Sequence, residues 1–392
     1  MKKIIVLFLL DLFISSTVAA YLYFARDVDA AFTTGLSIFI VFSPICFVLA
    51  EQFTIFLAGR KLSAQDVTFN NPDALKVLAD VDVVAMSYNR ILTCNEYYIT
   101  DLVPTEGLKQ SALLTMAASA EREAQHLIGR TIYDAATSRG LKLQKPTESE
   151  ELPGRGIESV INKILVRVGS PGWIASHNVS VNVILRNKID QLLVKGKTTL
   201  LVSTGRLARG IIALKDEINE DAKIFLMTLR QKKIETLLLT AQPKKMAYRI
   251  AKDFELDNIR TNLTPEGKAR EIQIFRAKGK VIAFIGTDNQ DLPALETADV
   301  SFLLSGDAEV KADFKIPTLE NFLTVRELAL KTGKVLKINR GLAVLSWIIL
   351  LPPAFLTALE NPPIQFNPLM AAAGVAIFSA IILANSEIGT RD

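Results

Sequence analysis

Four long apolar runs are the feature that most constrains how this chain can fold. They enclose a segment of ordinary soluble composition, from about residue 60 to 336. Each run is about long enough to cross the ~30 Å hydrocarbon layer of a bilayer as a helix. We therefore predict two transmembrane hairpins, residues 1–59 with helices at 4–24 and 32–57, and residues 337–392 with helices at 341–359 and 368–384.

The composition agrees with a membrane protein and excludes several other classes. Hydrophobic residues make up 49% of the 392 residues, which is too many for a disordered chain. The net charge of +4 gives no basic excess that would predict binding to nucleic acid. With only Cys46, Cys94, His126 and His177, neither a disulfide framework nor a zinc cluster is expected.

The first apolar run leaves a second interpretation open. Lys2 and Lys3 precede an apolar stretch that ends in Val18-Ala19-Ala20, as in a secretory signal peptide. Asp11, near the centre of the run, argues for a membrane span instead. Basic residues flank the insert, whereas the hairpin loops carry no basic excess. The positive-inside rule then predicts a plasma- or inner-membrane protein whose insert and both termini are cytoplasmic.

Strands and helices alternate within the insert. Helical patterns separate β-rich runs at 82–86, 198–202, 210–214, 234–240, 281–285 and 300–304. This alternation predicts an α/β domain with a doubly wound parallel sheet, whose ligands bind beyond the carboxyl ends of the strands. We assign residues 60–103 and 196–336 to this domain, and residues 104–195 to an inserted α+β subdomain.

Polar motifs follow these predicted strands: SYNRILT at 87–93, TAQP at 240–243, TPEGK at 264–268 and GTDNQD at 286–291. In order and position they resemble DKTGTLT, TGD, PEDK and GDGxND of the heavy-metal-transporting P-type ATPases. The resemblance implies a haloacid dehalogenase-like phosphorylation domain with an inserted nucleotide-binding-like subdomain, flanked by four transmembrane helices. The activity of that family is ATP-driven cation transport.

The same resemblance indicates a catalytically degenerate, truncated member. The phosphoacceptor aspartate falls at Ser87, the TGD aspartate at Gln242 and the first GDGxND aspartate at Thr287, while Thr240, Lys268 and Asp291 are retained. A serine cannot form an acyl phosphate, and Mg²⁺ usually needs one or two carboxylates. We therefore expect no intact catalytic site and weak or no Mg²⁺ binding. We also expect the guanidinium of Arg90 to pair with Asp291, with Asp288 as a second possible partner; the alternative is that Arg90 points into solvent.

The nucleotide subdomain keeps more of the family pattern. The resemblance implies that ATP or ADP binds at Glu121, His126, Gly154, Gly156 and Gly169. Each residue alone has a simpler explanation, because glycines are frequent in turns and a single histidine is often structural. Their occurrence together and in order favours nucleotide binding.

The metal pathway of the family is degraded as well. Its positions fall at Ser43, Cys46, Asn339 and Ser379. Soft metals select thiolate or thioether ligands, and Cys46 is one position away from the family's cysteine, so we expect no copper transport through these residues. The ionisable residues Asp11 and Glu51 lie within or near spans, where such residues are commonly functional.

The sequence therefore predicts a non-catalytic protein in the lipid bilayer that binds nucleotide and acts as a partner or regulator of another membrane protein. One alternative is a subunit of a cation-transporting P-type ATPase that a second chain completes. Another is a structural membrane protein that only retains the fold.

Overall fold

The computed structural model describes residues 2–152, 154–304, 310–359 and 365–390. It divides the chain into two units, Met1–Asp80 with Ala312–Asp392, and Val81–Lys311. The first unit contains long apolar helices, and the second contains two β-sheets. Part of the predicted loop between the last two spans, residues 360–364, lies outside the described residues.

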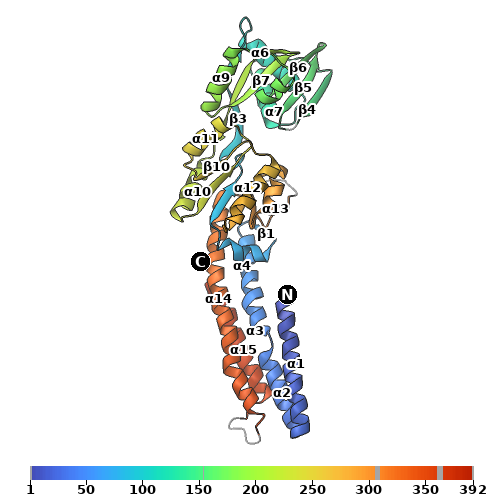
Figure 1. The fold of residues 1–392 in the computed structure, drawn as a ribbon, viewed down its shortest axis with the longest axis vertical. Helices are drawn as coiled ribbons and strands as arrows, with labels where there is room; N and C mark the ends of the chain where they lie inside the picture. Colours follow the sequence, from blue (N-terminus) through green and yellow to red (C-terminus); the bar gives the residue numbers. More distant parts are fainter. Residues whose placement is uncertain (1, 153, 305–309, 360–364, 391–392) are drawn as a thin grey trace. The chain divides into compact units, whose positions relative to one another are not determined.

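The predicted spans are helical. They correspond to α1 (Lys2–Ala25), the series α2 (Val28–Phe42), α3 (Ile45–Val48), η1 (Leu49–Phe53, a π-helical turn) and α4 (Thr54–Ser63), then α14 (Leu319–Leu356) and α15 (Pro368–Gly389). By length and composition these four helical segments can cross a membrane. α14 begins well before the predicted span at 341, and it runs beside α15 (Figure 1).

Local sequence explains where these helices begin and break. The side chain of Asp27 caps α2 by accepting the N–H of Ala30, and Asn367 caps α15 in the same way. α2 ends because Ser43 precedes Pro44 and adopts an extended backbone with ψ 132°. At Gly35 an added Cβ would lie 2.7 Å from the Cβ of Ala19, so the glycine permits α1 and α2 to pack closely.

Three short elements complete the first unit. They are β1 (Thr68–Phe69), α5 (Pro72–Leu78) and β13 (Phe314–Ile316). β1 pairs antiparallel with β13, and the rings of Phe69 and Phe314 stack with centroids 5.3 Å apart.

The second unit contains a parallel sheet with strand order β12 (Val300–Leu304), β11 (Ile282–Gly286), β2 (Val83–Met86), β9 (Glu235–Leu239) and β10 (Asn258–Arg260). The accompanying helices are α10 (Glu220–Gln231), α11 (Lys244–Asp253), α12 (Pro265–Ala277), η2 (Asn289–Asp291) and α13 (Leu292–Thr297). This is the doubly wound α/β arrangement that the alternation of strands and helices predicts.

A second sheet is antiparallel, with order β3 (Thr93–Pro104), β8 (Leu207–Ile218), β7 (Thr198–Thr204), β6 (Ile164–Gly169), β5 (Gly156–Ile161) and β4 (Glu148–Leu152). One apolar cluster packs its first face against α6 (Gln110–Ala120) and α7 (Leu127–Thr137). Another packs the opposite face against α8 (Pro171–Ser176) and α9 (Val183–Val194).

The prediction that the runs at 198–202 and 210–214 belong to the parallel sheet is wrong. They form the hairpin β7–β8, because the two residues between Thr204 and Leu207 are far too few for the crossover that parallel strands need. The antiparallel sheet extends over Thr93–Ile218, which is wider than the predicted range 104–195.

Candidate functional site

Four motifs converge at the carboxyl edge of the parallel sheet. Ser87 follows β2, Thr240 follows β9 and Thr287 follows β11, while Lys268 lies in α12 and Asp291 closes η2. Carboxyl ends of parallel strands meet at one edge, so residues far apart in sequence come together here. Ser87, Thr240, Thr287 and Asp291 are each at most 3% exposed.

Local caps place two of these residues. The hydroxyl of Thr264 accepts the N–H of Gly267 and begins α12, which puts Lys268 in its first turn. The carboxylate of Asp288 caps η2, which ends at Asp291. At Gly286 an added Cβ would lie 2.9 Å from the Cβ of Asp291, so only glycine allows this close approach.

Ser87, Lys268 and Asp291 form one buried polar triad. The Oγ of Ser87 donates to Oδ1 of Asp291 at 2.5 Å, and Nζ of Lys268 lies 2.7 Å from the same oxygen. Nζ also lies 3.1 Å from Oγ of Ser87. Oδ2 of Asp291 accepts the N–H of Thr287 at 2.9 Å. Both carboxylate oxygens therefore accept hydrogen bonds from protein groups, and an ammonium neutralises the charge.

This donor set does not fit Mg²⁺. The ion prefers a near-octahedral shell of oxygens with one or two carboxylates, and the site offers the single carboxylate of Asp291 with Lys268 on it. Thr240 accepts the N–H of Gln242 within its own loop at 3.1 Å. Among the described residues, no hydrogen bond links Thr240 or Gln242 to the triad.

The pairing of Arg90 with Asp291 that the sequence suggested is absent from the described residues. The backbone of Arg90 is left-handed (φ 61°), its side chain is exposed, and it has no ion pair within the described part of the chain. The turn at Arg90 leads its side chain away to solvent, whereas the first turn of α12 brings Lys268 onto the carboxylate. The retained lysine of the third motif was the signal for this pair.

The loop between α6 and α7 holds Glu121 and His126. Nε2 of His126 lies 3.2 Å from Oε2 of Glu121, and Nδ1 accepts the N–H of Gly129 at 3.0 Å, so the ring caps α7. Burial raises the pKa of Glu121, and the hydrogen bond from His126 opposes this. The hydrogen bond to Glu121 raises the pKa of His126. The pair is a preorganised acid–base couple on the antiparallel sheet.

The three candidate glycines differ in surroundings. A Cβ at Gly156 would lie 2.3 Å from the carbonyl oxygen of Val168, and one at Gly169 would lie 2.5 Å from the indole of Trp173. These two glycines therefore accommodate backbone pairing and the buried Trp173. Gly154 has φ +73° and open space where its Cβ would be. The N–H of Gln125 donates to Oε2 of Glu151 at 3.3 Å, which ties the histidine loop to β4.

The candidate transport residues separate into two places. Sγ of Cys46 lies 3.6 Å from Oγ of Ser379. Asn339 instead donates to Thr54 Oγ1 (3.2 Å) and Ser386 Oγ (2.7 Å) and accepts from Asn385, joining α4, α14 and α15. Ser43 stands at the helix break and joins neither group. In the described ranges no three His, Cys, Asp or Glu side chains converge as metal ligands. Sequence reasoning missed Thr54 and Ser386.

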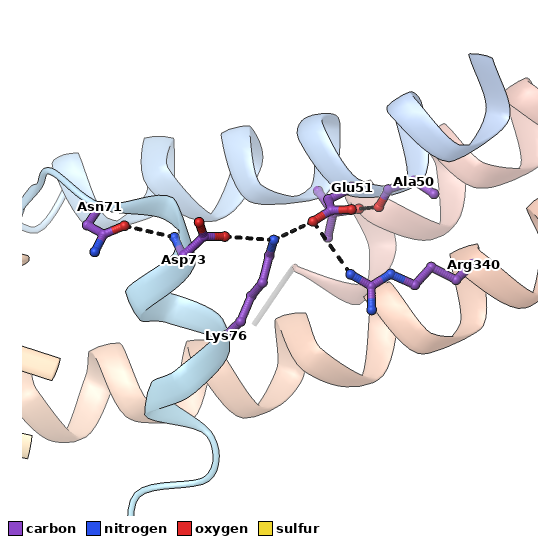
Figure 2. A network of polar contacts seen from close by, with 7 residues as sticks. Ala50, Glu51, Asn71, Asp73, Lys76 and Arg340 are labelled. Atoms are coloured by element: carbon purple, nitrogen blue, oxygen red, sulfur yellow. Dashed lines mark hydrogen bonds and ion pairs between the residues drawn. The ribbon is translucent and has the colours of Figure 1, made fainter. Parts of the chain in front are cut away.

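Glu51 and Asp11, the two ionisable residues predicted within or near spans, differ in their polar contacts. Figure 2 shows the carboxylate of Glu51, on the π-helical turn η1, between Lys76 of α5 and Arg340 of α14. Lys76 also pairs with Asp73 at 3.0 Å, so charge links three elements of this unit. Asp11 is fully buried on α1, and its carboxylate accepts no hydrogen bond from the described residues.

Comparison with known proteins places this geometry in a family. The family of haloacid dehalogenase-like hydrolases matches residues 88–299, more than half of the chain. The probable copper-exporting P-type ATPase of Archaeoglobus fulgidus is 29% identical over 91% of this chain and 44% of its own length. Copper-transporting ATPase 2 of Rhizobium meliloti is 27% identical over the same shares. The chain thus spans less than half the length of these relatives.

Solved structures show the same fold. A zinc-transporting PIB-type ATPase in the E2.Pi state superposes with a TM-score of 0.66 and 23% identity, covering 98% of this chain and 62% of that chain. The catalytic domain of a CPx-ATPase, solved in a study of nucleotide binding, superposes with a TM-score of 0.51 and 18% identity over 71% of this chain. The chain therefore belongs to the haloacid dehalogenase-like hydrolase family, and over 91% of its length it is related to metal-transporting P-type ATPases.

Proposed function

We propose that this protein is a membrane-embedded pseudo-ATPase, a partner or regulator of another membrane protein rather than a pump. The observation that carries the proposal is the triad of Ser87, Lys268 and Asp291. Where the family forms an acyl phosphate, this chain has a serine hydroxyl hydrogen-bonded to a carboxylate that an ammonium neutralises. Transfer of a phosphoryl group to a carboxylate cannot begin from this arrangement.

Acid trapping tests the loss of catalysis. The full-length chain in lipid nanodiscs is incubated with γ-labelled ATP and Mg²⁺, then precipitated in acid. We expect no more label than on a Ser87→Ala variant. A hydroxylamine-labile label would indicate an acyl phosphate. A hydroxylamine-resistant label that Ser87→Ala abolishes would indicate a phosphoserine. Either result would overturn the proposal.

The nucleotide subdomain supports the second part of the proposal, binding of ATP or ADP without a catalytic cycle. His126 and Glu121 hold each other in a loop tied to β4, and Gly154, which follows β4, has open space where a Cβ would lie. Because Asp291 is occupied by Lys268, we expect nearly the same affinity with Mg²⁺ and with EDTA.

Titration calorimetry on the full-length chain tests nucleotide binding. His126→Ala removes the ring that holds Glu121 and caps α7, and we expect this loss of preorganisation to weaken ATP binding by about tenfold. His177→Ala, which replaces the other histidine of the same subdomain, is the matched control. Equal affinity for the wild type and His126→Ala, or no binding by the wild type, would contradict this assignment.

One observation favours the alternative, a subunit of a pump: the chain covers only 44% of the length of each of the two copper-transporting relatives. A second chain could supply further helices and domains, but it cannot replace the side chain at position 87. Affinity purification from the native membrane distinguishes the two. Co-purification with a chain that forms a phosphoenzyme only in complex with this protein would favour the pump subunit.

A further inference from the structure

The antiparallel sheet has two outer strands, β3 and β4, and their surroundings carry opposite charge. β3 pairs only with β8, and in the described residues no strand lies along its other side. β4 pairs only with β5 and includes the exposed residues Glu148, Glu150 and Glu151. An unpaired strand edge presents backbone donors and acceptors to any strand that approaches it.

A groove of about 610 Å³ runs along the outer part of β3, from Ile99 to Pro104. Arg139 and Lys188 line it, and neither makes an ion pair or hydrogen bond within the described residues. Lys188 nevertheless lies near enough to Asp101 to help lower the pKa of that carboxyl, after the larger effect of the hydrogen bond from Lys197. The groove also contains Asp101, but Lys197 neutralises that carboxylate at 2.6 Å. The groove therefore has an uncompensated positive charge.

Arg139 and Lys188 flank the strand edge from opposite faces of the sheet. Arg139 follows α7, which packs on one face, and Lys188 lies on α9, which packs on the other. A strand added along β3 would point successive side chains to alternate faces. Two adjacent acidic residues of that strand would reach Arg139 and Lys188 respectively.

β4 has acidic residues in this arrangement. Glu151 is opposite Ile157, which belongs to the cluster under α6 and α7, so Glu151 lies on the α7 face. Glu150, the preceding residue, lies on the α9 face. If the sheet continued from one copy into the next, Glu151 would meet Arg139 and Glu150 would meet Lys188. The five residues of β4 are one fewer than the six residues of β3 that line the groove, so the strand fits within it.

We propose that β3 of one copy receives β4 of a second copy, extending the antiparallel sheet head to tail between molecules. The backbone carbonyl oxygen of Leu102 accepts a hydrogen bond from Nε2 of Gln110 at 3.0 Å. In the proposed interface it would instead accept a backbone N–H of the incoming strand. Such an interface is heterologous, so it builds rows rather than closed dimers. One strand pair is a small contact, and confinement to a bilayer raises the effective concentration that favours it.

Zero-length carbodiimide coupling in proteoliposomes tests the proposal, because it joins a lysine only to a carboxylate in direct contact. Equal amounts of ¹⁴N- and ¹⁵N-labelled full-length chain are mixed, coupled and digested. We expect mixed-isotope peptides that join Lys188 to Glu150. Arg139→Glu, which leaves Lys188 in place as the coupling amine, should lower the yield of the peptide that joins Lys188 to Glu150 about fivefold. Arg186→Glu, an exposed charge on the same helix outside the groove, should not change it.

A charge exchange keeps the test independent of folding defects. The ¹⁴N-labelled Arg139→Glu, Lys188→Glu chain is mixed with a ¹⁵N-labelled Glu150→Lys, Glu151→Lys chain. We expect a peptide that joins position 188 of the ¹⁴N chain to position 150 of the ¹⁵N chain, which is the exchanged pair; the wild-type pairing that the mixture also allows gives the opposite order of isotopes. Absence of inter-copy coupling in the wild type, or failure of the exchange to restore it, would overturn the proposal. Coupling of Lys188 only to an added acidic peptide, with none between copies, would show that the edge serves another protein and would overturn it equally.

Discussion

Ser87 and Asp291, 204 positions apart, share a hydrogen bond of 2.5 Å from the serine hydroxyl to the carboxylate oxygen Oδ1. Lys268 contacts the same oxygen, and its side chain is only 11% exposed. The three residues thus form a closed set of charges and hydrogen bonds within the parallel-sheet domain. The triad links β2, α12 and η2 to one another.

Removing the cation of this triad should destabilise the domain strongly. In Lys268→Met the carboxylate of Asp291 stays buried without its counter-charge, which costs about 3–5 kcal/mol. We expect the melting temperature of the full-length chain to fall by roughly 10 °C. Lys142→Met, on an exposed lysine, is the control.

A second variant separates charge from packing. Adding Asp291→Asn to Lys268→Met removes the buried charge and should recover part of the lost melting temperature. A single Lys268→Met variant that melts like the wild type, or a double variant that melts lower than the single one, would contradict the account.

The sequence predicted which loops meet at this site but not which cation holds Asp291. Strands ending before Ser87 and Thr287 must meet at one sheet edge, because parallel strands share their carboxyl ends. Arg90 was the expected cation because it lies in the same loop as Ser87, three residues further along the chain. The positive φ of Arg90 and the orientation of α12 are set by the folded structure. Only the structure therefore shows that Lys268 is the cation that neutralises Asp291.

The second sheet shows a different limit. The runs at 198–202 and 210–214 have the same β-rich pattern as strands of the parallel sheet, and only the short loop between them indicated a hairpin. Gly156 and Gly169 match a binding motif in sequence, yet they also make room for Trp173, whose position the sequence does not reveal. Pattern alone therefore does not separate a glycine needed for packing from one needed for a ligand.

Gly154 and Gly156, both in the predicted nucleotide-binding motif, should respond differently to substitution by alanine. At Gly156 the new Cβ would lie 2.3 Å from a backbone carbonyl oxygen, so neighbouring strands must move. Overpacking of this kind costs about 1–3 kcal/mol or more. Gly154→Ala meets nothing within 4 Å and carries only the ~1 kcal/mol cost of a positive φ. Thermal unfolding should therefore show the larger loss for Gly156→Ala. The reverse order would refute the packing role of Gly156.

The couple of Glu121 and His126 should make stability fall as pH rises. Folding raises the pKa of both groups, so the folded state favours their protonated forms. The contribution of His126 is complete below its unfolded pKa near 6.5 and is lost as pH rises through its higher folded value. We expect the melting temperature to decrease between pH 6 and pH 9 and His126→Gln to flatten this decrease.

The control for the pH series is His177→Gln, which replaces the other histidine of the subdomain. If His126→Gln and the wild type lose the same melting temperature over this range, then the pair does not govern the pH dependence.

Two polar networks in the helical unit should differ in importance. Asn339 is fully buried and makes three side-chain hydrogen bonds that join α4, α14 and α15, whereas Glu51 is 29% exposed between Lys76 and Arg340. Hydrogen bonds between membrane helices average about 0.6 kcal/mol each, so Asn339→Ala should cost about 2 kcal/mol. Glu51 makes two partly exposed ion pairs, each typically worth well under about 1 kcal/mol, and the amide of glutamine can still accept hydrogen bonds from both cations, so Glu51→Gln should cost about 1 kcal/mol or less. Unfolding of the full-length chain in mixed micelles with increasing dodecyl sulfate measures both, with helicity followed by circular dichroism. A larger loss for Glu51→Gln than for Asn339→Ala would show that the charged link between η1, α5 and α14 holds these helices more firmly than the buried amide does.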